Sequence, residues 1–272
     1  MSLNEKAQIT VFIPVYNGEN FIKCAIESVL SQTFCNFILV VADNCSTDST
    51  IDIVKRYYYD DRVRLVVRKQ NLGMIENFNR CIGDIRTKYF MALSHDDYFY
   101  SNQAIQAAYN VLESSQDVPA VYCETMFVDA NNKLIMKRSF GFSGQIQSDE
   151  IAKMALIAGR NMFGVPLLVR ADAVGSTRYS KDFVNTADID FSIALGRGKK
   201  IYYLPTPLIA VRFHGSNETH RTFSSLKNEF LAMAQKHHIP LSKCDHILLA
   251  LNGVLVNFKK KLFFYYLDKV RR

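Results

Sequence analysis

The sequence predicts an α/β domain built on a doubly wound, mostly parallel sheet. Through the first 115 residues, short apolar runs rich in β-branched and aromatic residues alternate with segments whose apolar residues recur at helical spacing. Strands that alternate with crossover helices form parallel sheets with right-handed connections. Each run ends in polar residues, so we expect these side chains to gather along the carboxyl edge of the sheet, where ligands bind in such folds.

The first 115 residues supply four expected strands and four expected helices. Ile9–Ile13 is a β-rich run that we expect Pro14 to end, because proline cannot donate a hydrogen bond to a central ladder. Ser46 or Thr47 is expected to cap the second helix, with Asp48 in its first turn. The further strands are expected at 37–41, 63–67 and 89–93, and the helices at 21–30, 48–58, 74–84 and 101–115.

The alternation weakens after residue 116, where the sequence predicts mixed strands and loops of the kind that often carry substrate contacts. Helical segments separated by Pro240 follow residue 224. The other expected elements are strands at 118–123, 164–170, 200–203 and one ending at 211–214, a hairpin over 126–136, and helices at 148–158 and from 187. No linker interrupts the chain before residue 220. We therefore expect one domain over 1–220, with halves at 6–115 and 116–220, and a helical extension over 221–272.

Composition indicates one full-sized globular domain. The chain has 272 residues, of which 49% are hydrophobic, which is enough for a substantial core. No stretch reaches the roughly 18 consecutive apolar residues that span a bilayer, and the N-terminus has no signal pattern, so a cytoplasmic location is expected. The six cysteines show no C-x-x-C pair and no metal-ligand spacing. We expect free thiols and no zinc site.

The positive charge is concentrated at one end of the chain. Residues 256–272 contain six Lys or Arg against one Asp, which is +5 of the total net charge of +7. A nucleic-acid-binding face spread over the domain is therefore not expected. Two roles for this basic, apolar-striped segment stay open: packing against the core, or peripheral contact with an anionic membrane surface.

Two adjacent carboxylates follow the strand expected at 89–93. Asp96 and Asp97 cannot enter the core, so they lie at the carboxyl end of a buried strand. There they could hold a divalent metal through hard oxygen ligands, or form a solvated turn before a helix capped by Ser101. The chain contains neither G-x-G-x-x-G after the first strand nor G-x-x-x-x-G-K-[ST]. A bound nucleotide would thus depend on side chains and a metal.

With these residues in order, the chain resembles a family 2 glycosyltransferase of the GT-A fold, from Ile9 to about His214. The resemblance rests on the order and spacing of several motifs. They are Ile13-Pro14-Val15-Tyr16-Asn17, the run from Asp43 to Thr50, Asn71-Leu72-Gly73, Asp96-Asp97, Ala187-Asp188 and Arg212-Phe213-His214. The resemblance implies a central sheet with a donor-binding half over 6–115, a smaller mixed acceptor-side half over 116–220, and C-terminal helices.

The resemblance also implies which residues contact the donor nucleotide. They are Pro14, Tyr16, Asn17, Asp43, Asn71 and Asp96. Asp43 would accept a hydrogen bond from the ring N–H of uracil, which agrees with the acceptor-only chemistry of a carboxylate. The donor would thus be a nucleotide sugar, and specifically a UDP-sugar. Asp48 and Ser46 are interpreted as structural residues that support the second helix.

For the metal, the resemblance implies Mn²⁺ or Mg²⁺ held by Asp97 and Asp96, with His214 as a further ligand. Ser94 stands where many members of the family have the first Asp of an Asp-x-Asp motif. A single carboxylate together with diphosphate oxygens still suits these ions, which often rely on substrate phosphates. Arg212 could donate to a phosphate or serve a structural role, and both interpretations stay open.

Asp188 matches the family's general base, which removes the proton of the acceptor hydroxyl. Ala187 replaces the usual Glu before it, and capping of the following helix is an alternative role for Asp188. The implied function is an inverting hexosyl- or N-acetylhexosaminyl-transfer from a nucleotide sugar to a glycan or lipid-linked acceptor, in polysaccharide biosynthesis.

Two alternative functions compete with this one. A nucleotidyltransferase would show a basic Gly-rich loop, which residues 15–20 lack, whereas a degenerate sugar-nucleotide binder would explain the losses at 94 and 187.

Overall fold

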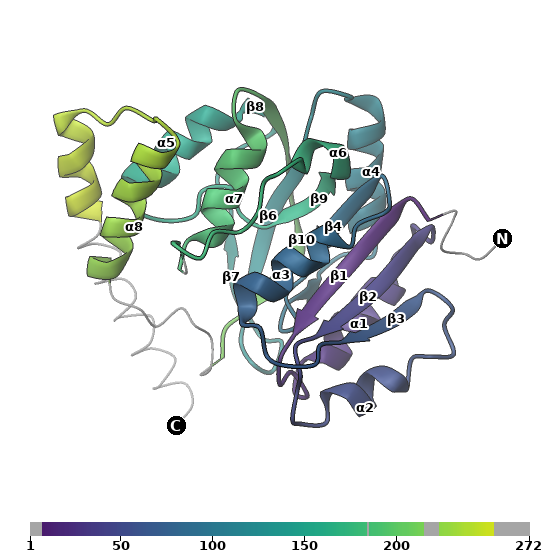
Figure 1. Ribbon diagram of the computed structural model, residues 1–272. Coiled ribbons are helices and arrows are strands. Elements are labelled where there is room, and N and C mark those ends of the chain that lie inside the picture. The colour runs from purple at the N-terminus through teal and green to yellow at the C-terminus, as the bar shows by residue number, and fades with distance from the viewer. Residues whose placement is uncertain (1–6, 184, 215–222, 253–272) are drawn as a thin grey trace.

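The computed structural model describes residues 7–183, 185–214 and 223–252. Figure 1 shows a central sheet flanked by helices, with α8 at the side remote from β3. The strands are β1 (Ile9–Val15), β2 (Phe37–Asp43), β3 (Val63–Val67), β4 (Tyr89–Ala92), β5 (Tyr98–Phe99), β6 (Ala120–Val128), β7 (Leu134–Arg138), β8 (Gly144–Gln147), β9 (Pro166–Arg170) and β10 (Lys200–Arg212). The helices are α1 (Ile22–Leu30), α2 (Thr50–Lys55), α3 (Met74–Gly83), α4 (Ala104–Ser114), α5 (Ser148–Ala158), α6 (Ala171–Val174), α7 (Ala187–Gly196) and α8 (Phe223–Lys236).

The described strands form one ten-stranded sheet of order β3-β2-β1-β4-β9-β6-β10-β5, with β7 paired to β6 and β8 paired to β10. Strands β1 to β4 pair in parallel, and β6 pairs in parallel with β10, whereas β9 runs antiparallel to both β4 and β6. The predicted α/β class with a mostly parallel sheet and a mixed second half is confirmed. The strand order reverses between β1 and β4, and such a switch point opens a crevice at the carboxyl ends of the strands.

Helices cover both faces of the sheet because successive residues of a buried strand point to opposite sides. In β1, Val11 and Ile13 pack into a core with α1, α2 and α4, whereas Phe12 between them packs into a second core with α3, α5, α7 and α8. All seven residues of β1 are buried. A strand covered on both faces carries no polar alternation, which is why this run is apolar except for Thr10, whose hydroxyl is hydrogen-bonded to that of Thr87.

Two sequence expectations about these strands are wrong in detail. Pro14 does not end β1, which continues to Val15 and pairs Pro14 with Ala42 of β2. The ladder to β4 ends at Phe12, so Pro14 lies where β1 has a single neighbour and a missing N–H is tolerated. The two strands expected at 200–203 and up to 214 are one strand, β10, whose register shifts around Pro207.

Other differences concern short elements. The structure adds β5, β8 and α6, which are too short to show a periodic pattern. Helix α2 begins at Thr50 with Ser49 at the N-cap position, so neither Ser46 nor Thr47 caps it. The hairpin at 126–136 forms as expected, with Asp129 accepting backbone N–H bonds from Asn131 and Lys133 at its turn.

The C-terminal residues that the structure describes pack on the second core. Helix α8 buries Phe230 and Met233 there, and residues 243–252 form a further helix. The basic segment 256–272 lies outside the described residues, and with it both roles considered for it. Within the described part of the chain, no helix has the length and apolar character needed to cross a membrane. The division of the chain at residue 220 stays a prediction.

Candidate functional site

The carboxyl ends of β1, β2 and β4 lie side by side. Val15 pairs with Asp43 in the register of β1 and β2, and the N–H of Leu93 donates to the carbonyl of Phe12 at 2.8 Å. The N–H of Asn44 donates to the carbonyl of Val15 at 2.8 Å. The loops after these three strands therefore begin at one edge, as the sequence pattern predicts.

The loop after β1 is bound to the loop after β2 through Asn17. Its backbone N–H donates to Ser46 Oγ at 2.9 Å, and its side-chain oxygen accepts from the N–H of Thr47 at 2.8 Å. Asn17 has a φ of 51°, a left-handed conformation that asparagine tolerates better than most residues. Tyr16 beside it is 43% exposed. Asn17 thus shapes the edge through its own side chain, while Tyr16 presents a ring to solvent.

Gly18 and Asp48 hold the same two loops together. The N–H of Gly18 donates to Thr50 Oγ1 at 2.8 Å, and Asp48 accepts from the N–H of Glu19 at 3.0 Å. Although partial burial acts to raise it, hydrogen bonds from Thr50 and Glu19 lower the pKa of Asp48. A Cβ at Gly18 would lie 2.6 Å from the ring of His95, so only glycine fits this approach. The structural interpretation of Asp48 and Ser46 agrees with these contacts.

Asp43 ends β2 with an incompletely satisfied carboxylate. Its side chain is fully buried, and its Oδ2 accepts from the N–H of Ser46 at 3.0 Å. Its Oδ1 has no hydrogen-bond partner among the described residues. A buried oxygen without a donor is costly, and such groups mark positions where an external N–H or O–H would be stabilised.

Asn71 supports the loop that follows β3. Its Oδ1 accepts from Asn44 Nδ2 at 2.8 Å and from the N–H of Gly73 at 2.8 Å. Asn44 in turn accepts from the N–H of Leu72 at 2.9 Å. The Asn71-Leu72-Gly73 motif is therefore fixed to the end of β2, and Asn71 itself is exposed.

Asp96 and Asp97 lie between β4 and β5 and are bound to the end of β10. Asp97 Oδ1 accepts from the backbone N–H of Arg212 at 2.9 Å, and the carbonyl of Asp96 accepts from Arg212 Nε at 2.7 Å. His214 Nε2 lies 3.0 Å from Asp96 Oδ2. The structure thus brings two predicted ligands, Asp96 and His214, into contact from positions 118 residues apart, while Asp97 bonds to Arg212. Arg212 contacts the main chain of this turn, which favours its structural role.

The two neighbouring carboxylates differ in environment. Burial and then the charge of Asp96 raise the pKa of Asp97 well above its usual range. Burial also acts on Asp96, but the hydrogen bond with His214 and the nearby His95 lower its pKa. Within the described residues, no three His, Cys, Asp or Glu side chains form a ready-made metal cluster. Among the described residues, only Oδ1 of Asp97 accepts a hydrogen bond, so the donor set fits an ion that is bound partly by substrate oxygens.

A cavity of about 560 Å³ extends from Asp97 to the N-terminus of α7, whereas Asp96 and His214 do not line it. Ser94 and Asp97 line it at one part, and Asp188 lines it at another. Its remaining walls come from α3, Arg138 of β7, segments 159–161 and 164–166, and Leu226 and Phe230 of α8. The predicted nucleotide contacts Pro14, Tyr16, Asn17, Asp43 and Asn71 do not line this cavity; they lie at the adjoining strand ends.

Asp188 is held at the start of α7 by Asn161. Asn161 Nδ2 donates to Asp188 Oδ2 at 2.6 Å and to the carbonyl of Gly164 at 3.1 Å, while its Oδ1 accepts from the N–H groups of Phe163 and Gly164. Asp188 is open to the cavity, yet protein atoms surround it on the other sides. This desolvation raises the pKa of Asp188, and the hydrogen bond from Asn161 opposes that rise.

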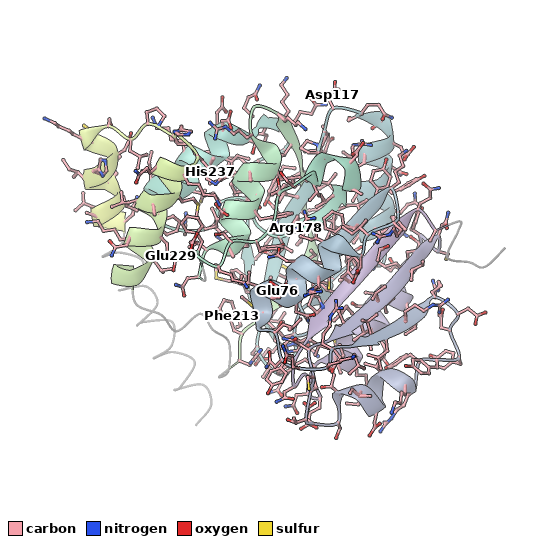
Figure 2. The ribbon with its side chains drawn as sticks, in the orientation of Figure 1. Glu76, Asp117, Arg178, Phe213, Glu229 and His237 are labelled. Carbon is pink, nitrogen blue, oxygen red and sulfur yellow. The ribbon has the colours of Figure 1, made fainter. Side chains whose placement is uncertain are left out.

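Helix α8 fixes the chain just before Asp188. Glu229 accepts from the backbone N–H and the side-chain amide of Asn185, and from Thr186 Oγ1 at 2.8 Å. Two residues beyond Asp188, Asp190 is almost fully buried and accepts from Lys236 Nζ at 2.8 Å and His237 Nε2 at 2.7 Å. Glu229 and His237 are labelled in Figure 2, at the end of the molecule that carries α8. Asp190 therefore anchors α8 to α7, while Asp188 faces the cavity.

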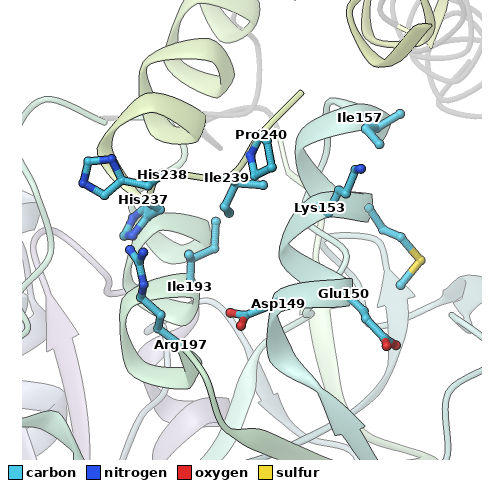
Figure 3. Close-up of a pocket in the computed structure, with 11 residues that line it drawn as sticks. Asp149, Glu150, Lys153, Ile157, Ile193, Arg197, His237, His238, Ile239 and Pro240 are labelled. Atoms are coloured by element: carbon cyan, nitrogen blue, oxygen red, sulfur yellow. The ribbon is translucent and has the colours of Figure 1, made fainter. Parts of the chain in front are cut away.

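A second cavity of about 530 Å³ lies between α5, α7 and the segment that follows α8 (Figure 3). Arg197 and His237 line it on one side, and Asp149 and Lys153 on the other. None of the predicted site residues reaches it. The second cavity is lined by helices and connecting segments and contains no strand end, whereas the first cavity lies at the end of β4. The first cavity is therefore the candidate active site.

Sequence reasoning missed four residues that shape this site: Asn161, Glu229, Arg138 and Arg160. None belongs to a contiguous motif. Asn161 lies 27 positions from Asp188, and Glu229 lies 44 positions from Asn185. Only the packing of α5, α7 and α8 brings them together. In the sequence, the one available signal was the Gly159-Arg160-Asn161 break after a predicted helix.

Comparison with known proteins gives a family and a fold. The model of Glycosyl transferase family 2 matches residues 10–173. An uncharacterised glycosyltransferase of Rickettsia typhi is 27% identical over 264 residues, which are 93% of this chain and 80% of that protein. One of Rickettsia bellii is 29% identical over 208 residues, which are 76% of this chain but only 30% of that protein. This chain therefore spans less than a third of the length of the Rickettsia bellii relative.

Solved structures share the fold at low identity. TarS of S. aureus in complex with UDP-GlcNAc superimposes with a TM-score of 0.68 at 15% identity, over 90% of this chain and 71% of that one. Mannosyltransferase PcManGT of Pyrobaculum calidifontis in complex with GDP-Man and Mn²⁺ gives a TM-score of 0.56 at 15% identity, over 93% and 81%. The fold is the GT-A fold that the resemblance implied.

Proposed function

Because this chain belongs to glycosyl transferase family 2, we propose that it is an inverting enzyme that moves a sugar from a nucleoside diphosphate to a hydroxyl of a glycan or lipid-linked acceptor. One observation carries the proposal: a single cavity joins Asp97, at the end of β4, to Asp188, at the start of α7. Transfer with inversion needs a leaving group stabilised on one side of the sugar and a base on the other.

The donor is proposed to be a UDP-sugar. The buried Oδ1 of Asp43 is an unpaired acceptor at the strand edge, and it suits the ring N–H of uracil. Exposed Tyr16 offers a face on which a base can stack, and Pro14, Asn17 and Asn71 shape the loops around it. A TarS structure that contains UDP-GlcNAc supports this choice, whereas the GDP-Man complex of PcManGT makes GDP the natural competitor to test.

Mn²⁺ or Mg²⁺ fits the carboxylate pair, and we assign Asp97, Asp96 and His214 to hold it. When bound, such an ion neutralises the negative charge of the leaving diphosphate. Asp96 and Asp97 would supply the hard oxygens, and His214 lies beside Asp96 at 3.0 Å. Arg212 keeps the turn in place through its bonds to both aspartates.

In the proposed reaction, Asp188 is the general base. Its carboxylate takes the proton of the acceptor hydroxyl as that oxygen forms a bond to the anomeric carbon. The bond between this carbon and the diphosphate oxygen breaks, and its electron pair leaves with the nucleoside diphosphate. Attack from the side opposite the leaving group inverts the anomeric carbon. Asn161 orients the carboxylate through its 2.6 Å hydrogen bond.

A second candidate function is a sugar-nucleotide-binding protein that has lost catalysis. The absence of a three-residue metal cluster in the described part of the chain, together with Ser94 and Ala187, favours it.

For the transferase, the donor sugar is proposed to be a hexose or N-acetylhexosamine used in polysaccharide biosynthesis. Peripheral membrane contact through residues 256–272 stays part of the proposal, and loss of binding to anionic vesicles after deletion of these residues would test it.

Thermal unfolding tests the donor site. UDP, GDP and dTDP are added with and without Mn²⁺, and Asp97→Ala is the control. A ligand at about 100 times its Kd adds about 2.7 kcal/mol of stability, which raises the melting temperature by several degrees. We expect a shift with UDP and Mn²⁺ that Asp97→Ala abolishes. A larger shift with GDP would mean that the donor is a GDP-sugar and not a UDP-sugar. No shift with any nucleotide would contradict the proposal.

Turnover of UDP-sugars separates the two candidate functions. Asp188→Asn keeps the shape of the side chain but removes the base, so we expect turnover to fall by about 10²- to 10⁴-fold while UDP binding persists. Asp172→Asn, in the exposed first turn of α6, is the matched control and should keep full turnover. Undetectable turnover in the unmodified protein, with UDP binding intact, would favour the binding protein.

A further inference from the structure

Two arginines line the candidate active site, and neither is in a salt bridge among the described residues. Arg138, at the end of β7, and Arg160, just after α5, both line the 560 Å³ cavity. Neither forms a salt bridge within the described residues, and Arg160 makes no side-chain hydrogen bond there. The acidic residues that line this cavity are Asp97 and Asp188, both of which already have proposed roles.

Arg138 is held by ring contacts and one hydrogen bond, and the charge of Asp188 acts on it without a salt bridge. Its guanidinium lies 4.6 Å from the ring centre of Phe140 and 5.7 Å from that of Phe127, and one N–H donates to the carbonyl of Asn161. Burial and then the charge of Arg160 lower the pKa of Arg138 to about 10, although Tyr203 and Asp188 act to raise it. Two like charges in one partly buried place cost stability unless an anion lies between them.

Arg170 is a buried arginine with a purely structural role, and its hydrogen bonds can be compared with those of Arg138. Its guanidinium donates to the carbonyls of Val118, Leu112 and Ser115 and to the hydroxyl of Tyr89. These acceptors satisfy it without an acidic partner. Arg138 has one such acceptor, so most of its five N–H donors remain for a ligand in the cavity that it lines.

We propose that Arg138 and Arg160 bind an oxyanion, a phosphate or a carboxylate, carried by the acceptor. The proposal rests on the proposed function, since it takes Asp188 to face the acceptor. Asn161 links the two groups: its carbonyl accepts from Arg138, and its side chain donates to Asp188. An acceptor whose oxyanion binds Arg138 therefore presents a nearby hydroxyl to the base. A guanidinium recognises both oxyanions through paired N–H bonds.

Titration of UDP-saturated protein with small anions tests this site. Saturation with UDP and Mg²⁺ occupies the donor side, so an added anion reports on the remaining cavity. The probes are inorganic phosphate, glucuronate and, as the neutral comparison, glucose. We expect phosphate or glucuronate to bind, glucose not to bind, and Arg138→Gln or Arg160→Gln to weaken anion binding by about tenfold or more. Preference for phosphate identifies a phosphorylated acceptor, and preference for glucuronate an acidic sugar.

The controls keep the outcomes distinct. Arg86→Gln removes an exposed arginine whose side chain, among the described residues, bonds only to the nearby carbonyls of Gly83 and Ile85. This variant should bind the probes like the unmodified protein. Arg160→Gln removes no side-chain hydrogen bond or salt bridge among the described residues, so we expect its thermal unfolding to match that of the unmodified protein. Equal anion binding in all variants, or no binding at all, overturns the proposal.

Loss of UDP binding in Arg138→Gln also overturns it, because the arginine would then serve the donor diphosphate. Failure of the proposed function gives a different result. In that case the unmodified protein shows no UDP shift, while anion binding that depends on both arginines still supports the oxyanion site. The two proposals can therefore fail separately.

Discussion

At the carboxyl edge of β1, β2 and β4, polar side chains bond to loops that follow neighbouring strands, whereas around α7 they bond to helices far away in the sequence. Asn17 and Asp48 bind loops that each follow a parallel strand. Asp188 and Asp190 instead depend on Asn161 and on Lys236 of α8. The first region is organised by the sheet, and the second by helix packing. A substitution should therefore act locally in the first and across elements in the second.

The largest effect is expected where helix packing depends on one buried charge. Asp190→Ala removes the carboxylate that Lys236 and His237 share, and it leaves His237 buried without its partner. Removing one partner of a buried ion pair costs about 3–5 kcal/mol. We expect the free energy of unfolding, measured in urea, to fall by this amount. Asp61→Ala, at an exposed position before β3, should change it by less than about 0.5 kcal/mol.

A glycine comparison tests the strand edge. Gly18→Ala places a Cβ 2.6 Å from both the His95 ring and Val15 Cγ2, and such overpacking costs about 1–3 kcal/mol. Gly83→Ala, at the end of α3, meets no atom within 4 Å and should stabilise the helix by about 0.5–1 kcal/mol. Thermal unfolding of both variants gives the result. Equal changes in the two would mean that the approach of Gly18 to His95 is not tight.

The Glu229→Gln variant tests whether a contact made by α8 affects turnover at Asp188. The variant weakens the acceptor for Asn185 and Thr186, which precede Asp188, without touching the strand edge. We expect kcat to fall by about tenfold, equivalent to about 1.4 kcal/mol, while UDP affinity is unchanged. Turnover and thermal shift with UDP are the two readouts. A loss of UDP affinity would show that the two regions are coupled rather than separate.

The smallest expected effect is a shift in the pH dependence of turnover. Burial raises the pKa of Asp188, so the deprotonated base is lost at a higher pH than for an ordinary carboxyl group. The folded protein also binds this proton more tightly than the unfolded chain, so the contribution of Asp188 to stability increases as pH falls through the folded pKa. Asn161→Ala removes a hydrogen bond that lowers this pKa. The acid limb of kcat/KM should therefore move to higher pH, and a shift to lower pH would contradict the assignment.

The sequence was most informative for the first region. A chain that returns to the same sheet edge after each crossover places its polar exits together, so Asn17, Asp43 and Asp97 could be predicted to lie along one edge from the alternation of strands and helices. The extension of β1 through Pro14 could not be predicted, because it depends on where the ladder with β4 ends. The roles of these site residues stay predictions.

By itself, the sequence determined the alternating strands and helices, the α/β class and the carboxylates at strand ends, because periodicity and residue type are local properties of the chain. Only the tertiary structure decided that Asn161 orients Asp188, that Glu229 supports the loop before it, and that Arg138 and Arg160 share its cavity. The first two contacts join residues that are 27 and 43 positions apart. The packing of the helices, and not a local sequence pattern, determines which side chains meet.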